Sequence, residues 1–389
     1  MYDRKVGNIH LEITSKCNAR CPQCIRTFHN SPHTDPTLPE EELSLDELIK
    51  ILDDPAFSDV ESIAINGTYG DVVMHSNPLP LMQEIVRRKI DIRLHTNGSG
   101  LSKHFWEEIG KLQLHVVFAL DGLADTHHLY RRNTRFDITL ANAETFINNG
   151  GTAVWQFIKF KHNKHQVDEA RAMAKQKGFI KFVEIPSSSR FPIHYNAISV
   201  KDKNFDHSYY LEKESAIDEG AVVGQSSNIL KVTPMVDIDD IREAYSNPPT
   251  LVKRPVGKPS PRTEHIPNEI ACNVKSGKNH NGSGSLYIGY DKRLWPCCFI
   301  APAFDSPQRS GNTNNLHLLF KKQLDKDYDF NNVIKHSVGE IMDDTNNFRV
   351  VSDEWTKSTL CDVCNFSCCA DTGGWTKSRG KQKGWLEEI

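Results

Sequence analysis

The sequence lacks any run of about 18 apolar residues, so no segment of it predicts a membrane-spanning helix. It also lacks the apolar leader of a signal peptide, because a strand-like pattern begins within the first ten residues. We therefore expect a cytoplasmic protein without a membrane partner. An excess of charge of one sign is also lacking, since 47 Lys and Arg stand against 50 Asp and Glu and the formal net charge is −3. This gives no indication of a general nucleic-acid-binding protein.

Cysteine is absent between residues 24 and 272, although the chain contains ten cysteines in all. They form two groups, at positions 17, 21 and 24 and at positions 272, 297, 298, 361, 364, 368 and 369. A small secreted disulfide framework would spread its cysteines more evenly along the chain. The grouping instead indicates two metal sites, because closely spaced thiols in a reducing compartment act first as metal ligands.

The first group places Cys17, Cys21 and Cys24 at spacings of four and three residues in one short loop. A structural zinc site needs four protein ligands, whereas three thiolates on an iron–sulfur cubane leave one iron open to another ligand. The alternative is a zinc-stabilised loop whose fourth ligand is a more distant residue such as His29 or His33.

The chain up to about residue 185 alternates strand-like and helix-like patterns. Strands are expected at 9–14, 62–66, 90–96, 114–120, 153–160 and 179–185, and helices at 44–52, 80–89, 102–111, 138–149 and 166–177. Ser44 and Glu47 predict a capping box at the start of the first helix. This rhythm predicts a parallel sheet covered by helices, which right-handed crossovers would curl into a partial (β/α)6 barrel.

The cysteine loop and the apolar strand before it resemble the signature of the radical S-adenosylmethionine (SAM) superfamily. The resemblance implies the same partial barrel and a [4Fe–4S] cluster on Cys17, Cys21 and Cys24. The open iron would chelate SAM, and one electron would cleave SAM to give a 5′-deoxyadenosyl radical.

Residues at the predicted carboxyl ends of the strands resemble the SAM-binding segments of that family, and chemistry gathers at these ends in such barrels. The segment 66–71 is similar to the Gly-Gly-Glu segment, with Asp71 in the acidic position, and 95–98 resembles the Thr-Asn-Gly turn. The segment 118–132 is similar to the Ser-Leu-Asp-Gly…Arg segment, although Ala119 stands where the family has Ser. Arg131, with Arg132 beside it, would pair with the SAM carboxylate. The resulting cofactor-binding candidates are Asn66, Gly67, Gly70, Asp71, Thr96, Asn97, Asp121, Arg131 and Gln156.

Two of these predictions concern side-chain direction on the last strands. Gln156 and its neighbour Trp155 must face opposite sides of a strand, and we expect Gln156 to face the interior and reach the ribose of SAM. Glu184 could project into the mouth of the barrel as a proton acceptor, and it is the catalytic candidate. An ordinary salt bridge is the alternative for Glu184.

The second cysteine group resembles a twitch domain, the short form of the SPASM domain, which holds an auxiliary [4Fe–4S] cluster. Cys272 precedes a hairpin-like run at 285–297, a helix is expected at 338–343, and a C-x2-C pair follows. By this resemblance the ligands are Cys272, Cys297, Cys361 and Cys364, and Lys292 occupies the hairpin turn position that is often Gly. The remaining Cys298, Cys368 and Cys369 leave open a second auxiliary cluster or an exchange of Cys368 for an assigned ligand. A structural zinc site is a further alternative.

We expect three regions: the partial barrel at 1–190, a linker at 191–265 that contributes to the substrate pocket, and a small α+β twitch-like domain at 266–389. The expected function is a radical SAM oxidoreductase that dehydrogenates a small polar molecule such as a sugar or aminocyclitol. An external one-electron donor such as flavodoxin or ferredoxin would be its partner. Peptide modification is the alternative, which the early start of the first strand disfavours because no peptide-recognition domain precedes it. A non-catalytic zinc-binding protein is the alternative from another class.

Overall fold

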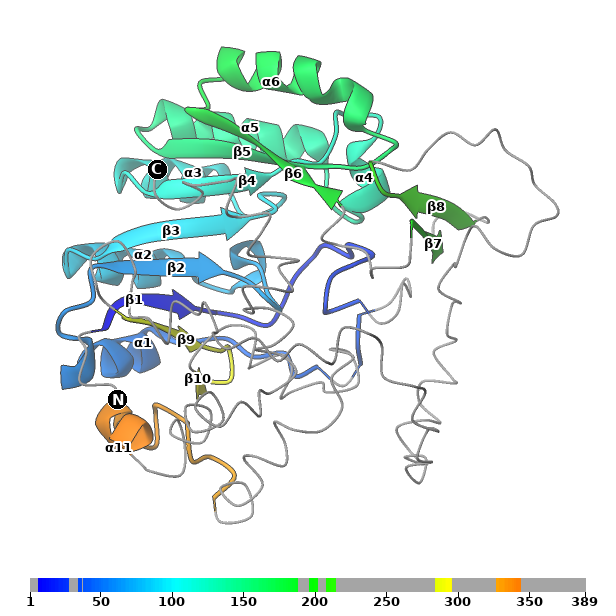
Figure 1. The fold of residues 1–389 in the computed structure, drawn as a ribbon. Helices are drawn as coiled ribbons and strands as arrows, with labels where there is room; N and C mark the ends of the chain where they lie inside the picture. Colours follow the sequence, from blue (N-terminus) through cyan, green and yellow to red (C-terminus); the bar gives the residue numbers. More distant parts are fainter. Residues whose placement is uncertain are drawn as a thin grey trace, which may run out of the picture.

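The computed structural model describes residues 6–27, 34–36, 38–187, 196–201, 208–214, 284–295 and 327–343. Six parallel strands run through the first half of the chain (Figure 1). They are β1 (Val6–Leu11), β2 (Ser62–Asn66), β3 (Asp91–Thr96), β4 (His115–Ala119), β5 (Thr152–Lys159) and β6 (Lys181–Pro186). Each pairs with the next in chain order, so the predicted alternation and strand order are confirmed.

Helices connect these strands. They are α1 (Leu45–Leu52), α2 (Leu79–Arg87), α3 (Lys103–Lys111), α4 (His127–Tyr130), α5 (Phe136–Asn148) and α6 (Val167–Gln176), with 3-10 turns at Pro55–Phe57, Val72–Met74 and Lys164–Gln166. The predicted capping box of Ser44 and Glu47 is present at the start of α1. The apolar sides of the helices and one face of the sheet form a continuous buried core, represented by Ile63, Leu94 and Trp155. The other face of the sheet, here called the inner face, carries polar side chains such as His10 and Gln156 together with buried apolar ones such as Ile158.

The C-terminal part of the chain adds strands to the same sheet. Strand β9 (Gly284–Ile288) pairs in parallel with β1, and β10 (Leu294–Trp295) pairs antiparallel with β9, so the eight-stranded sheet runs from β10 to β6 (Figure 1). The predicted hairpin is therefore confirmed, and its position beside β1 was not predicted. Helix α11 (Val338–Asp343) lies next to the α1 region, where Val338 N–H donates to Asp54.

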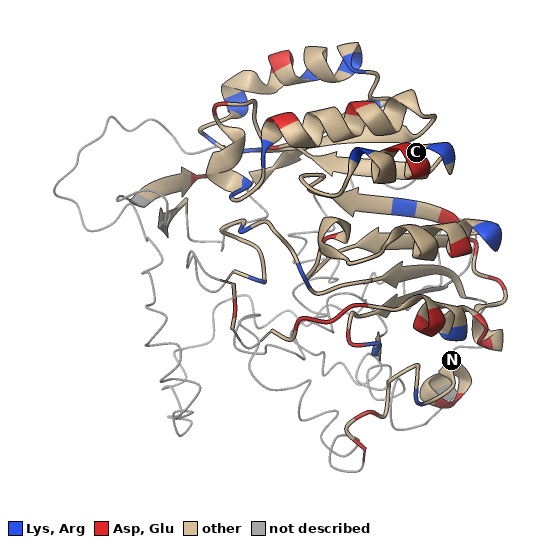
Figure 2. Cartoon of the chain, turned by 180° about the vertical axis from the view of Figure 1, so that it is seen from behind, with Lys and Arg blue, Asp and Glu red and all other residues tan. Residues whose placement is uncertain are grey.

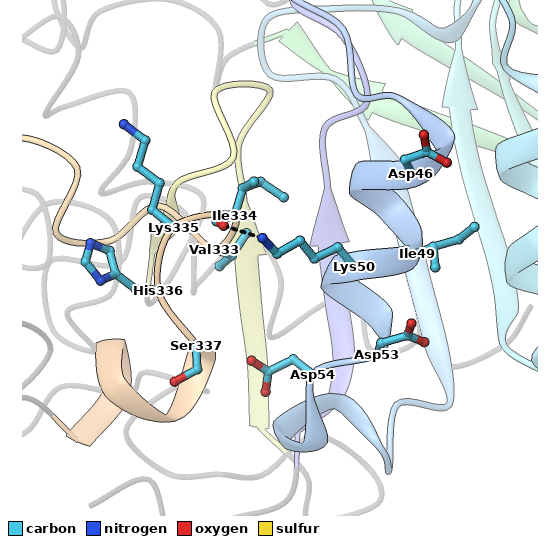
Figure 3. Close-up of a pocket in the computed structure, with 10 residues that line it drawn as sticks. All are labelled: Asp46, Ile49, Lys50, Asp53, Asp54, Val333, Ile334, Lys335, His336 and Ser337. Atoms are coloured by element: carbon cyan, nitrogen blue, oxygen red, sulfur yellow. Dashed lines mark hydrogen bonds between the residues drawn. The ribbon is translucent and has the colours of Figure 1, made fainter.

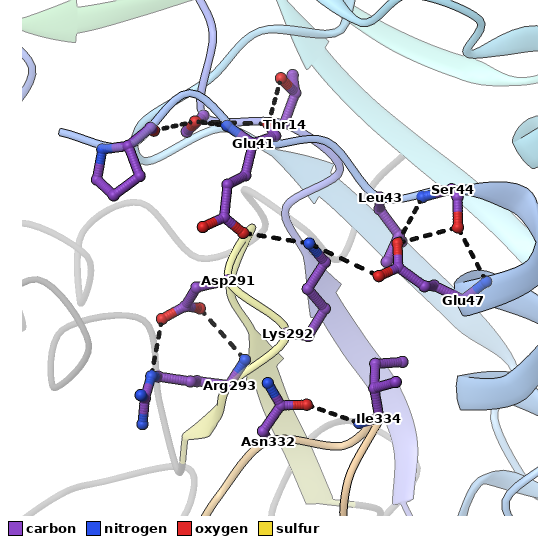
Figure 4. Close-up of polar contacts among 12 residues, drawn as sticks. Thr14, Glu41, Leu43, Ser44, Glu47, Asp291, Lys292, Arg293, Asn332 and Ile334 are labelled. Carbon is purple, nitrogen blue, oxygen red and sulfur yellow. Dashed lines mark hydrogen bonds and ion pairs between the residues drawn. The ribbon is translucent and has the colours of Figure 1, made fainter. Parts of the chain in front are cut away.

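Lys292 occupies the hairpin turn in the left-handed region, with φ 62°. Its ammonium group lies 3.2 Å from Glu41 and 3.7 Å from Glu47 (Figure 4). Glu41 in turn accepts hydrogen bonds at its backbone carbonyl from Ser15 N–H and the Thr14 hydroxyl. The hairpin turn is thus linked through Glu41 to Thr14 and Ser15, directly before the cysteine loop.

A second hairpin, β7 (Ala197–Lys201) and β8 (Ser208–Glu212), lies in the region expected to be a linker. Its buried Ile198, Val200 and Leu211 pack in one apolar cluster with Cys21 and Phe160. This hairpin was not predicted, and it brings part of the 191–265 region to the cysteine loop.

Acidic and basic residues are interspersed along the helices (Figure 2). Among the residues that the structure describes, no helix is long and apolar enough to cross a membrane.

Candidate active site

The cysteine loop leaves the carboxyl end of β1 and is held by backbone hydrogen bonds. Cys24 N–H donates to the Cys21 carbonyl at 3.0 Å, and Arg20 N–H donates to the Arg132 carbonyl at 2.9 Å. Cys21 is buried, and Cys17 and Cys24 are half-buried. Within the described residues, no group of three His, Cys, Asp or Glu side chains is arranged to hold a single metal ion. His29 and His33, the candidates for a fourth zinc ligand, lie outside the described residues.

The surroundings of the thiols act against ionisation in the metal-free protein. Burial raises the pKa of Cys21 to about 11, and burial together with the nearby Asp71 and the other two thiols raises the pKa of Cys17 well above its ordinary value. A bound cluster deprotonates its cysteine ligands outright and offsets this penalty. The three thiols lie near enough to act electrostatically on one another. Three thiolates, each on a different iron, would fit a cubane with one open iron.

The glycine turn after β2 packs directly against the entry to the cysteine loop. A Cβ on Gly70 would lie 1.8 Å from the Thr14 carbonyl oxygen, and one on Gly67 would lie 1.6 Å from the Gly70 carbonyl oxygen. Both contacts are with backbone atoms, which cannot swing aside as a side chain can. The two glycines are therefore required for close approach of the backbone at this turn.

Asp71 fastens this turn to the end of β3. Its carboxylate accepts the Thr96 hydroxyl at 2.6 Å and Asn97 N–H at 2.7 Å, while Asp71 N–H donates to the Lys16 carbonyl. Asn97 Nδ2 donates to Asn18 Oδ1 at 2.9 Å and lies 3.8 Å from Cys17 Sγ. The structure thus brings Asp71, Thr96 and Asn97 together beside the first thiol.

Asp121 and Arg131 form a buried ion pair beside the second thiol. Arg131 Nε donates to Asp121 Oδ2 at 2.6 Å, and Arg131 Nη1 lies 3.8 Å from Cys21 Sγ. Asp121 is fully buried and also accepts Ile158 N–H at 2.6 Å, which anchors the pair to the end of β5. Two of the guanidinium nitrogens predicted to meet a SAM carboxylate are therefore engaged within the protein.

The strand register places Gln156 and Glu184 on opposite faces of the sheet. Gln156 lies opposite Ala119 and Val183, on the inner face, as expected. Glu184 lies opposite Phe157, on the face that packs against helices, so the expectation that it projects into the barrel mouth is wrong. Its carboxylate pairs with Lys159 at 3.1 Å and with Arg171 of α6. Partial burial acts to raise the pKa of Glu184, but hydrogen bonds from these two cations outweigh it and lower the pKa.

The inner face carries a polar group that the sequence reasoning missed. His10 lies beside Tyr287 of β9 with ring centroids 4.9 Å apart, and its Nε2 lies 2.5 Å from the Asn66 carbonyl oxygen. Glu12 accepts Thr68 N–H, and burial raises its pKa to about 7 against hydrogen bonds from Thr68 and Tyr287. His10 and Glu12 alternate with apolar Ile9, Leu11 and Ile13, and this period of two was the signal that could have found them.

One pocket lies away from all of these residues. It is lined by Asp46, Ile49, Lys50 and Asp53 of the α1 region, by Asp54, and by residues 333–337 (Figure 3). No predicted site residue lines it. The predicted auxiliary ligands Cys272, Cys297, Cys361 and Cys364, with Cys298, Cys368 and Cys369, lie outside the described residues.

Residues 11–179 match the family model of the Radical SAM superfamily. A curated relative from Pyrococcus furiosus, a tungsten-containing aldehyde ferredoxin oxidoreductase cofactor-modifying protein, is 29% identical over 117 residues, 30% of this chain. A GTP 3′,8-cyclase from Desulforamulus reducens is 30% identical over 142 residues, 35% of this chain. The matched segments span 31% and 41% of these two relatives.

Similar solved structures have low sequence identity. Streptococcus suis SuiB bound to S-adenosylmethionine is 13% identical with a TM-score of 0.45, and the match covers 76% of this chain and 61% of SuiB. The structure of anSMEcpe with bound AdoMet is 16% identical with a TM-score of 0.39, and the match covers 46% of this chain and 49% of that one.

Proposed function

We propose, on the premise that residues 11–179 form a radical SAM domain, that the protein cleaves SAM reductively and removes a hydrogen atom from a substrate C–H bond. Cys17, Cys21 and Cys24 would hold the [4Fe–4S] cluster, which when bound supplies one electron to SAM and yields the 5′-deoxyadenosyl radical. The electron would come from an external one-electron donor such as flavodoxin or ferredoxin.

The observation that carries this proposal is the convergence of separate strand ends on the three thiols. The turn after β2 reaches the cysteine loop through Gly70, the end of β3 reaches Cys17 through Asn97, and the segment after β4 reaches Cys21 through Arg131. A solvated loop with incidental cysteines would not need hydrogen-bonding partners from the ends of separate strands. Asn66, Gly67, Gly70, Asp71, Thr96, Asn97, Asp121, Arg131 and Gln156 are accordingly proposed to line the SAM site.

The preferred reaction is a two-electron dehydrogenation of a small polar molecule. The substrate would lose a hydrogen atom to the deoxyadenosyl radical and then a proton and an electron, with the electron passing to an auxiliary cluster. The proposed ligands of that cluster are Cys272, Cys297, Cys361 and Cys364. The polar inner face, with His10, Asn66 and Gln156, supports a substrate that offers hydroxyl or amino groups.

Peptide modification is the second candidate. Glu184 is not part of either proposal, because its carboxylate lies on the helix side of the sheet. A non-catalytic zinc-binding protein is the reading that the tests below must exclude.

The first test measures iron and labile sulfide per chain after anaerobic reconstitution, with 5′-deoxyadenosine formed from SAM under dithionite. About eight irons with 5′-deoxyadenosine would support two clusters, and about twelve would indicate a second auxiliary cluster. About four irons with cleavage would leave the first cluster alone. Zinc without iron would refute the enzyme proposal.

A pair of cysteine variants separates the two proposed clusters. We expect Cys24→Ala to abolish SAM cleavage, because the cluster loses one of its three ligands. Cys364→Ala should leave part of the cleavage intact and block formation of the oxidised product. Equal loss of 5′-deoxyadenosine in both variants would contradict this division of roles.

A further inference from the structure

Two thiols of the cysteine loop each face a nitrogen donor from another part of the chain. Asn97 Nδ2 lies 3.8 Å from Cys17 Sγ, and Arg131 Nη1 lies 3.8 Å from Cys21 Sγ. Such distances are within the range of N–H···S hydrogen bonds. Hydrogen bonds to cluster sulfurs and nearby charge are among the features by which a protein sets the reduction potential of an iron–sulfur cluster.

The Arg131 donor is held in a defined orientation. Its Nε donates to Asp121 at 2.6 Å, and its guanidinium also lies over the Tyr130 ring, 5.5 Å from the centroid. Asp121 is itself fixed, because it is fully buried and accepts Ile158 N–H. Only 15% of the Arg131 side chain is exposed, so water screens its charge weakly. The cation is therefore a permanent part of the surroundings of Cys21.

The pair places opposite charges near the thiol. Arg131 Nη1 lies 3.8 Å from Cys21 Sγ, and the Arg131 guanidinium and the Asp121 carboxylate both act electrostatically on this thiol. A cation beside a cluster stabilises the reduced state, which carries one more negative charge, and an anion destabilises it. Removing the cation should lower the potential, and neutralising the anion should raise it.

We infer that the Asp121–Arg131 pair sets the reduction potential of the cluster on Cys17, Cys21 and Cys24, with Arg131 raising the potential and Asp121 lowering it. This inference rests on the proposed function, because it requires that cluster. It assigns Arg131 a role toward a cluster ligand, in addition to the SAM-carboxylate contact implied by its position in the sequence.

The test is a redox titration of the anaerobically reconstituted full-length protein without SAM, followed by the electron paramagnetic resonance signal of the reduced cluster. The signal that disappears in Cys24→Ala is assigned to the cluster on Cys17, Cys21 and Cys24. Any signal that remains in this variant is assigned to auxiliary clusters. We expect Arg131→Gln to lower the equilibrium constant for one-electron reduction at least tenfold, which is about 59 mV. Asp121→Asn should raise this constant by a smaller factor, because the carboxylate acts on Cys21 less strongly than the guanidinium does.

The matched control is Arg87→Gln, which removes an arginine from an exposed ion pair with Glu84 on α2 and should leave the potential unchanged. If Arg131→Gln fails to assemble the cluster, Arg131→Lys is used instead, because it keeps the charge without the planar guanidinium. We expect it to lower the equilibrium constant for reduction by less than tenfold. Iron content is measured for every variant, so that a lost cluster is not mistaken for a shifted one.

Unchanged potentials in Arg131→Gln and Asp121→Asn at normal iron content would overturn the inference. So would shifts of both variants in the same direction, or a loss of SAM affinity without any shift, which would make Arg131 a SAM ligand only. A wild-type protein that binds no cluster would refute the proposed function itself, and the iron measurement distinguishes that failure from the others.

Discussion

Glu12 shows how the fold changes the chemistry of a single side chain. It lies 1% exposed on the inner face, where burial raises its pKa to about 7 from an ordinary value of 4.5. The folded state therefore binds this proton more tightly than the unfolded state does. Ionisation of Glu12 therefore lowers the free energy of unfolding. This destabilisation is absent below about pH 4.5, grows as the pH rises and is complete above about pH 7, where it reaches about 3 kcal/mol.

We predict that Glu12→Gln removes this loss of stability. The amide oxygen can still accept Thr68 N–H, and the neutral side chain carries no charge to desolvate. The free energy of unfolding, measured by denaturant titration at pH 5 and pH 8, should fall less for the variant than for the wild type over that interval. An identical pH dependence in both proteins would show that Glu12 does not titrate as its burial implies.

Gly70 tests the steric requirement at the turn beside the cysteine loop. A methyl group there would meet the Thr14 carbonyl oxygen at 1.8 Å, so we predict that Gly70→Ala destabilises the fold by about 3 kcal/mol. Gly339→Ala is the matched control, because nothing lies within 4 Å of a Cβ at that helical position, and it should be neutral or slightly stabilising. Equal free energies of unfolding in the two variants would contradict the close-packed turn.

At the scale of single elements, the β9–β10 turn illustrates two opposing effects at one residue. Lys292 adopts φ 62°, which costs a non-glycine residue roughly 1 kcal/mol, while its ammonium pairs with Glu41 and Glu47. We predict that Lys292→Gly is about 1 kcal/mol more stable than Lys292→Ala, because both lose the ion pairs and only Gly relieves the strain. Denaturant titration of both variants measures this difference.

Salt separates the contribution of the Lys292 ion pairs to stability from the contribution of backbone strain. The stability gap between the wild type and Lys292→Ala should shrink in 1 M salt, because partly exposed ion pairs are screened there. The gap between Lys292→Gly and Lys292→Ala should not change, because backbone strain does not depend on ionic strength. A salt-dependent gap between these two variants would assign the effect to charge alone.

The elements of the first half of the chain could be predicted because each carries a local pattern. The six strands and their helices are apolar runs with strand or helix periodicity, and the observed bounds of β2 match the expected ones at 62–66. The direction of Glu184 could not be predicted in the same way. A strand that alternates every residue exchanges its two faces when the register shifts by one, and only the pairing with Phe157 settles it.

In the candidate site, too, some residues could be predicted from local sequence and others could not. Recognisable short segments contain the glycine turn, Thr96, Asn97, Asp121 and Arg131, so the position of these residues beside the cysteine loop could be predicted from the sequence. Tyr287 could not be placed near His10 and Glu12, because the parallel pairing of β9 with β1 joins residues almost 280 positions apart. No local pattern specifies such a distant partner.

At the scale of the whole molecule, the pairing of β9 with β1 indicates that the C-terminal hairpin is part of the main sheet and not of a separate domain. Residues 266–389 were expected to form a domain of their own, yet β9 shares hydrogen bonds with β1, and Leu286, Ile288 and Leu294 are buried in the main core. Lys50 also donates to the Ile334 carbonyl at 2.8 Å, which ties α1 to the segment before α11. The described part of this region should therefore unfold together with the first strands.

We predict that Leu286→Ala lowers the stability of the entire sheet. Leu286 is 2% exposed, and truncation of a buried leucine costs about 2–5 kcal/mol. Hydrogen exchange of the amides in β1 and β9 should accelerate together, because loss of β9 leaves β1 paired on one side only, with β2. Tyr210→Ala, at a 59% exposed position on β8, is the control and should leave exchange in β1 unchanged. Faster exchange in β9 with full protection retained in β1 would mean that the hairpin opens alone, as expected if residues 266–389 form a domain of their own.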